Sequence, residues 1–229
     1  DAGEVDAIGL VEGIAAQGAL KVFAWLKENP TPSAKQALDR FNASLPEGRM
    51  KRFADACAWV RERKPRNLAT NGGFEERGIS RAQGAADWST EGAPAGWSTW
   101  SRNGKKQFSV RGGAGKSGSA AAIVSEDTSD SATFLLTVPA GAGVRYLAGA
   151  WLKGTPQAVA SFGVRFRTAS GWHTNREGEA SATVGAGETW RQCLHYIELP
   201  PGSASLVLML GAGERGTVYF DDVTLYKLE

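Results

Sequence analysis

Two adjacent aspartates near the end of the chain are the residues whose type and position most suggest chemistry. Asp221 and Asp222 lie within residues 216–226, a segment rich in β-branched and aromatic residues. The hydrophobic alternation of this segment shifts by one residue at the aspartates, which predicts a strand with a bulge. Burying two carboxylates in an apolar strand costs free energy unless a cation or several hydrogen-bond donors receive them. The pair therefore predicts a site.

A second acidic pair, Glu75 and Glu76, follows the turn signal Asn71-Gly72 in residues 67–76. We expect this segment to be a strand that pairs with residues 216–226. The carboxylates could act as general acid and base on a sugar, hold a structural calcium ion, or remain solvated acids at a sheet edge. The sequence contains no nucleophile elbow, no H-E-x-x-H motif and no phosphate loop, because the glycine-rich residues 112–117 lack the required spacing. A structural cation is therefore favoured, and residues 112–117 are interpreted as a hairpin connection.

Tryptophans are the second group of candidates, because an indole stacks on the apolar face of a sugar. The chain has eight of them. Trp100 lies in a glycine-flanked loop and Trp172 in residues 170–173, so both are predicted to be exposed. Trp97, Trp151 and Trp190 are expected to serve packing rather than ligand binding.

The segment 159–168 alternates cleanly between large apolar and polar residues. Arg165 and Arg167 lie on its polar side, where planar guanidinium donors suit sugar hydroxyls or a sugar carboxylate. An ordinary solvated sheet face remains the alternative. We predict that Arg165, Arg167, Trp100 and Trp172 line one groove, and that His195 is a strand histidine with its hydrogen bonds satisfied.

The elements that must position these residues change in kind near residue 65. Residues 67–229 hold most of the 29 glycines and many short β-rich runs separated by turn clusters, which predicts a mainly β chain folded as an antiparallel sandwich or jelly roll. The predicted strands are 107–111, 120–124, 132–138, 144–152, 159–168, 190–199, 206–210 and 217–226.

Residues 1–64 have the apolar spacing of three amphipathic helices, at about 4–29, 31–45 and 44–64. A three-helix segment of this size has a thin core, and Trp59 lies beside its apolar stripe. We interpret it as the tail of a preceding domain, or as a connector that docks on the sandwich. Residues 67–229 are expected to fold without it.

Composition argues against several partners and cofactors. Lys and Arg number 26 against 24 Asp and Glu, without the basic clustering that a nucleic-acid surface needs. No run of 18 apolar residues predicts a membrane span. Two cysteines, Cys57 and Cys193, and two scattered histidines favour free thiols over a disulfide or a zinc site. The start at Asp1, without an apolar signal segment, suggests a mature or excised chain.

Residues 67–229 resemble the carbohydrate-binding modules of families 4, 9, 16 and 22, which have a galactose-binding-like jelly-roll fold. The resemblance rests on an opening N-x-G-F-E pattern at 71–75 and a closing D-D-V-x-L pattern at 221–225. The residues between these two patterns agree with the same family in their order. They are Gly96-Trp97-Ser98-Thr99-Trp100, Gly118-Ser119-Ala120-Ala121, residues 146–153 and Thr189-Trp190-Arg191.

The resemblance implies non-catalytic binding of a polysaccharide or oligosaccharide by a module of a larger glycan-degrading protein, secreted or in the cell envelope. It implies a structural calcium held by Glu75 and by Asp221 or Asp222. The parent's catalytic domain is the implied protein partner. The alternative is a sandwich of the same fold that packs on a catalytic domain and binds no glycan, since fold alone does not fix function.

Overall fold

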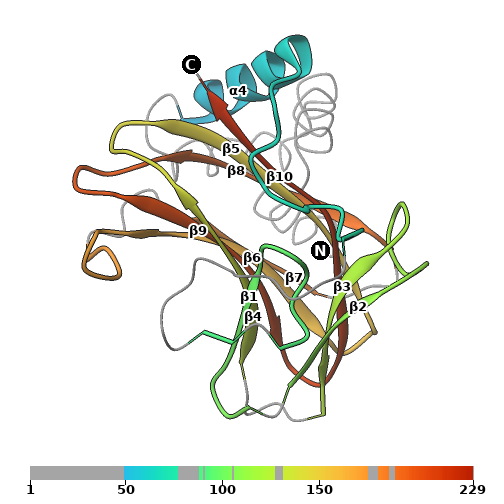
Figure 1. Cartoon of the computed structure of the whole chain (residues 1–229). Coiled ribbons are helices and arrows are strands. Elements are labelled where there is room, and N and C mark those ends of the chain that lie inside the picture. Colours follow the sequence, from blue (N-terminus) through green and yellow to red (C-terminus); the bar gives the residue numbers. More distant parts are fainter. Residues whose placement is uncertain are drawn as a thin grey trace, which may run out of the picture.

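The computed structural model describes residues 49–76, 88–89, 91–104, 106–126, 131–174, 180–185 and 189–228. They form a β-sandwich of two five-stranded sheets, with the helix α4 packed outside it (Figure 1). The mainly β sandwich predicted from the sequence is confirmed. The elements are α4 (Arg49–Arg63), β1 (Ser98–Ser101), β2 (Gln107–Arg111), β3 (Ala120–Ser125), β4 (Ala132–Pro139), β5 (Arg145–Gly154), β6 (Val159–Arg167), β7 (Ala180–Gly185), β8 (Arg191–Glu198), β9 (Ser205–Gly213) and β10 (Gly216–Leu228).

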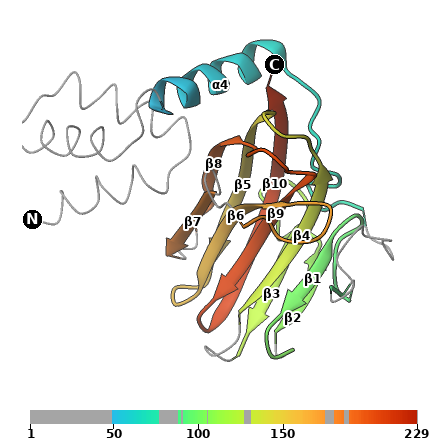
Figure 2. The ribbon, with the colours of Figure 1, turned by 90° about the vertical axis from the view of Figure 1, so that its left-hand side faces the viewer.

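Most neighbouring strands in each sheet are not consecutive in the sequence; the consecutive neighbours are β2-β3 and β6-β7. Sheet A has the order β1-β4-β9-β6-β7 and sheet B the order β2-β3-β10-β5-β8, with all neighbours antiparallel. Crossovers of this kind are typical of jelly rolls. Figure 2 shows α4 at the end of the sandwich where the C-terminus lies.

The core lies between the two sheets and follows from the period-two pattern of the strands. Along β6, Phe162, Val164 and Phe166 are fully buried, while the residues between them are half-buried on the outer face of sheet A. Phe134 of sheet A meets Phe220 of sheet B edge to face, with ring centroids 6.4 Å apart. Trp97 is fully buried against Phe74, as its predicted packing role requires.

The expectation that residues 67–76 form a strand is wrong. The segment lies along β10 through single main-chain bonds, from Leu68 N to the Leu225 carbonyl at 2.8 Å and from Val223 N to the Gly72 carbonyl at 2.9 Å. Asn71 and Phe74 have φ of 49° and 56°, which interrupts a ladder. Gly72 lies so close to the Val223 carbonyl that a Cβ would overlap it. The predicted partnership with residues 216–226 holds, but its form is a turn.

The helix α4 packs on the outer face of sheet B. Leu147 of β5 and Leu228 of β10 are almost fully buried beneath it, in contact with a cluster that includes Trp59 and Val60. The sandwich therefore covers part of the Trp59 indole, which the helical pattern placed beside the apolar stripe. The two earlier predicted helices, and the predicted start of this one near residue 44, lie outside the described residues.

Removal of residues 1–66 is expected to leave a chain that still unfolds in one cooperative transition at a lower temperature. Burying a leucine contributes about 1.5–3 kcal/mol, so exposing Leu147 and Leu228 costs a few kcal/mol while the inter-sheet core is untouched. Thermal denaturation followed by circular dichroism checks this result. Loss of the cooperative transition would place the boundary elsewhere, and an unchanged melting temperature would show that the α4 contact adds no stability.

Candidate functional site

The outer face of sheet A carries the arginines that the sequence singled out. The alternation of β6 puts Ser161, Gly163, Arg165 and Arg167 on this face, as predicted, because the intervening residues enter the core. Val207 pairs with Arg165 on the neighbouring strand β9 and is fully buried. The arginines therefore stand beside an apolar part of the sheet surface rather than on a fully solvated one.

A tight turn after β6 brings Trp172 back over these arginines. Thr168 N donates to the Gly171 carbonyl at 2.8 Å, and Trp172 then forms an isolated bridge with Arg167. The Arg165 Cζ atom lies 4.4 Å from the centroid of the Trp172 indole, and the Arg167 Cζ atom lies 5.4 Å from it. The turn thus fixes the indole in cation–π contact with both guanidinium groups.

Trp88 completes this group and was not predicted. Its indole lies 6.0 Å from that of Trp172, and the Arg167 Cζ atom lies 5.4 Å from its centroid. The next residue, Ser89, is held to Thr99 by two main-chain hydrogen bonds of 2.9 and 2.6 Å. We call Trp88, Arg165, Arg167 and Trp172 the indole–arginine cluster.

Trp100 also belongs to sheet A, but it lies on an edge strand away from the cluster. It is on β1, separated from β6 by β4 and β9, which is about 14 Å at the usual strand spacing. Trp100 instead lines a cavity of about 460 Å³ together with Glu91, Lys106 and Phe108. Of the four predicted ligand-binding residues, the structure brings Arg165, Arg167 and Trp172 together and places Trp100 apart.

The predicted bulge is present in β10, where the register with β5 shifts between Asp221 and Thr224. Asp221 is fully buried, and its Oδ2 atom accepts hydrogen bonds from Lys116 N at 2.7 Å and Ser117 N at 3.2 Å. Its Oδ1 atom accepts one from Asp222 N at 2.7 Å. Burial raises the pKa of the Asp221 carboxyl, and these hydrogen bonds oppose that rise.

The other acids divide between this site and the surface. Glu75 Oε1 accepts a hydrogen bond from Ser119 N at 2.7 Å, so Glu75 and Asp221 bind the same loop, residues 115–119. A Cβ at Gly115 would meet Asp221, and one at Gly118 would meet Glu75, which explains both glycines. Asp222 is half-exposed and lies 3.4 Å from the Lys116 Nζ atom. The loop 115–119, interpreted from the sequence as a hairpin connection, therefore also binds the carboxylates of Glu75 and Asp221 through its main-chain N–H groups.

We propose calcium as a structural ion held by Glu75 and Asp221 at this loop, with Asp222 outside its ligand set. Calcium takes carboxylate and main-chain oxygens, and the hydrogen bonds leave Glu75 Oε2 and one lone pair of Asp221 Oδ1 for it. Within the described ranges, no three His, Cys, Asp or Glu side chains are grouped to hold a metal. Main-chain carbonyls of the loop would have to supply the remaining oxygens.

Added calcium is expected to raise the melting temperature of the protein, and a chelator is expected to lower it again. A ligand bound only by the native state adds about 2.7 kcal/mol at a hundred times its dissociation constant. Differential scanning calorimetry of the wild type, Glu75→Gln and Asp222→Asn tests the assignment. Asp222→Asn should keep the calcium response and Glu75→Gln should lose it. A wild type that is indifferent to both calcium and chelator would exclude the ion.

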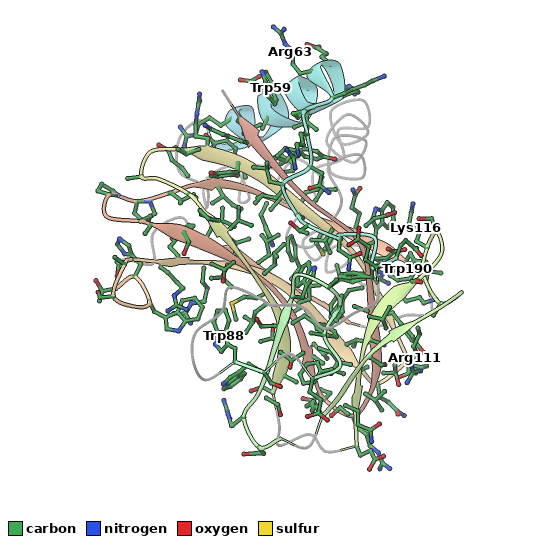
Figure 3. All side chains as sticks on the ribbon, in the orientation of Figure 1. Trp59, Arg63, Trp88, Arg111, Lys116 and Trp190 are labelled. Carbon is green, nitrogen blue, oxygen red and sulfur yellow. The ribbon has the colours of Figure 1, made fainter. Side chains whose placement is uncertain are left out.

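Two further tryptophans predicted to serve packing lie half-buried on the outer face of sheet B. The Lys116 Nζ atom is 4.6 Å from the Trp151 ring centroid, and the Lys153 Nζ atom is 4.7 Å from that of Trp190. Figure 3 shows Lys116 and Trp190 on one side of the molecule and Trp88 on another. Sheet B therefore offers aromatic residues away from the indole–arginine cluster, suitable for control substitutions.

The remaining singled-out residues have structural roles. His195 Nε2 lies 3.2 Å from the Phe162 carbonyl and its ring stacks on Phe162, which confirms a satisfied strand histidine. Cys57 and Cys193 are free thiols, as predicted, and burial raises the pKa of each to about 11. No helix among the described residues is long and apolar enough to cross a membrane.

Similarity to known proteins is found at the level of structure. No protein-family model and no curated sequence matches the chain. The enzymatically active domain of tailspike protein 4 of bacteriophage CBA120 aligns with a TM-score of 0.53 and 16% identity, over 71% of this chain and 21% of that one. This chain thus spans about a fifth of the length of the tailspike domain.

Solved carbohydrate-binding modules are also among the similar structures. A family 61 module in complex with β-1,4-galactotriose aligns with a TM-score of 0.49 and 19% identity, over 71% of this chain and 99% of that one. A family 4 module aligns with a TM-score of 0.47 and 19% identity, over 69% of this chain and 99% of that one. The jelly-roll sandwich that the resemblance implied is the fold of this chain.

Proposed function

We propose that the sandwich is a non-catalytic carbohydrate-binding module that holds a polysaccharide or oligosaccharide at the indole–arginine cluster. The observation that carries the proposal is the cluster itself, in which two indoles and two guanidinium groups meet on the outer face of sheet A. Indoles offer apolar faces to sugar C–H groups, and guanidinium groups offer directed donors to sugar oxygens. These are the two kinds of contact that sugar binding requires.

The exposure of Trp172 supports binding at this position. Trp172 is 37% exposed and is the one large hydrophobic residue exposed among those described. Its ring is in contact with two arginines from a regular strand, so little side-chain freedom is lost when a ligand binds. An exposed indole in a fixed orientation is a suitable platform for a sugar ring.

The rival function, a sandwich that only packs on another domain, would be favoured by a flat apolar surface. Within the part of the chain that the structure describes, two leucines of the outer face of sheet B, Leu147 and Leu228, are already covered by α4. The remaining outer side chains of that sheet include the cation–aromatic pairs of Lys116 and Lys153. These observations favour glycan binding over a purely structural role.

The parent protein, in this proposal, is a secreted or cell-envelope protein that acts on glycans. The module changes no bond itself. It raises the effective concentration of a catalytic domain near an insoluble or long substrate, as linked binding modules do.

Screening the labelled chain on a glycan array, beside the Trp172→Ala variant, tests the proposal. We expect the wild type to bind at least one class of glycan and the variant to lose that signal. A wild type without binding to any glycan would overturn the proposed function. Equal binding by the variant would move the binding site away from the cluster.

A further inference from the structure

The guanidinium groups of Arg165 and Arg167 lie over the indole rings of the cluster. The Arg165 Cζ atom lies 4.4 Å from the Trp172 centroid, while the Arg167 Cζ atom lies 5.4 Å from both indole centroids. A guanidinium on a ring face occupies the place where the C–H face of a neutral sugar would stack. Its N–H donors lie in its own plane and remain suited to a planar acceptor. The cluster is therefore better equipped for hydrogen bonding to an anion than a bare indole platform would be.

The positive charge of the cluster also favours an anionic ligand. Arg165 and Arg167 are two residues apart on one face of β6, which places their Cα atoms about 6.6 Å apart. Both guanidinium groups contact the Trp172 indole, so two cationic groups meet at one ring. Among the residues that the structure describes, the contacts of the Arg167 guanidinium are with Trp88 and Trp172, and none is with a carboxylate. An anionic ligand would give the Arg167 guanidinium a carboxylate partner.

We propose that the indole–arginine cluster selects sugars that carry a carboxylate, that is, oligosaccharides containing uronic acid residues. This inference rests on the proposed function of the same cluster. A carboxylate is planar and has two oxygens that match the two parallel N–H bonds of a guanidinium fork, so it pairs with Arg167 in a defined orientation. The pyranose ring beside it then has the remaining indole surface for contact. Charge and shape together distinguish a uronate from the neutral sugar of the same skeleton.

The experiment compares uronic acid oligosaccharides with matched neutral forms. Galacturonate, guluronate, mannuronate and glucuronate oligomers, each with its carboxyl-reduced counterpart, are titrated into the full chain by isothermal calorimetry. We expect at least one uronate to bind about tenfold or more tightly than its reduced form, with an affinity that falls as salt rises, since exposed charge pairs are screened over about 10 Å at 0.1 M. Glycans from the array that carry no charge are included as the neutral reference.

Variants separate the roles of charge and stacking. Arg167→Gln is expected to lose the preference for the uronate while keeping residual binding, and Trp172→Ala to lose binding to both forms. Arg111→Gln, on sheet B beside Tyr219, removes one positive charge elsewhere and should leave the preference unchanged.

Three outcomes are decisive. Reduced and acidic forms that bind equally at the cluster would overturn the carboxylate inference and leave the proposed function standing. A uronate preference that survives Arg167→Gln but disappears in Arg111→Gln would move the anion site to sheet B and contradict the inference. No binding of any acidic or neutral glycan would overturn the proposed function and this inference with it.

Discussion

Replacing Asp221 with alanine is expected to lower the free energy of unfolding by about 2–4 kcal/mol. The carboxylate is fully buried and accepts three main-chain hydrogen bonds, two of them from the loop 115–119. Removing it leaves partly buried N–H donors without an acceptor, and each such donor costs about 1–3 kcal/mol. The loop and the bulge of β10 would lose their main connection. Urea denaturation in the presence of a chelator measures the change.

Asp222→Ala is the matched control for this prediction. Asp222 is adjacent in sequence and has the same chemistry, but its contact is a half-exposed pair with Lys116 at 3.4 Å. Exposed ion pairs contribute between zero and about 1 kcal/mol, so we expect a change of less than 1 kcal/mol. Equal effects of the two substitutions would mean that the Asp221 hydrogen bonds do not stabilise the fold.

The pH dependence of the Asp221 effect has a definite sign. Burial raises the pKa of Asp221 in the folded state, so the folded protein keeps this proton to a higher pH than the unfolded chain does. The stabilising contribution of the group is complete below the unfolded-state pKa and falls as pH rises through the folded-state value. Measured with a chelator present, so that no calcium ion holds the carboxylate ionised, the stability difference between wild type and Asp221→Ala should therefore be larger in acid than at neutral pH.

Trp172→Ala is expected to weaken glycan binding by about tenfold or more while leaving the melting temperature nearly unchanged. Stacking contributes on the order of 1 kcal/mol beyond the buried area, and 1.4 kcal/mol is a factor of ten in affinity. The indole is 37% exposed, so its loss opens no cavity in the core between the sheets. Calorimetric titration of the glycan identified on the array, with a melting curve for each variant, measures both quantities.

Trp190→Ala serves as the control on the other sheet. Its indole is half-buried beneath Lys153 on the outer face of sheet B, away from the cluster. We expect this variant to bind the glycan as the wild type does and to lose some stability. If Trp190→Ala lost affinity and Trp172→Ala did not, the binding face would be sheet B.

The features predicted successfully from the sequence are those set by local periodicity. The alternation in 159–168 correctly placed Arg165 and Arg167 on an outer face, and the shifted alternation at Asp221 located the bulge. Both follow from the two-residue period of a strand. Strands without such a pattern were missed as strands, namely β1 and β7.

The features that the sequence could not show depend on contacts between distant segments. Trp88 has no periodic neighbours that would mark it, and its contact with Trp172 joins two segments that are far apart in the sequence. The loop 115–119 has the composition of any flexible connection, and only the fold shows that its N–H groups receive Asp221 and Glu75. Residues 67–76 carry a turn signal that was recognised, but the positive φ of Phe74 was not predicted.

The indole resonances of the eight tryptophans offer the most direct test of glycan binding at the cluster. In a titration of the array-identified glycan followed by nuclear magnetic resonance, we predict that the Nε1–H signals of Trp88 and Trp172 shift together with the same dissociation constant. Those of Trp97, which is fully buried, and of Trp190 on sheet B should stay in place. Assignment by single tryptophan-to-phenylalanine variants identifies each signal. Shifts confined to Trp151 and Trp190, with Trp88 and Trp172 unmoved, would contradict the account.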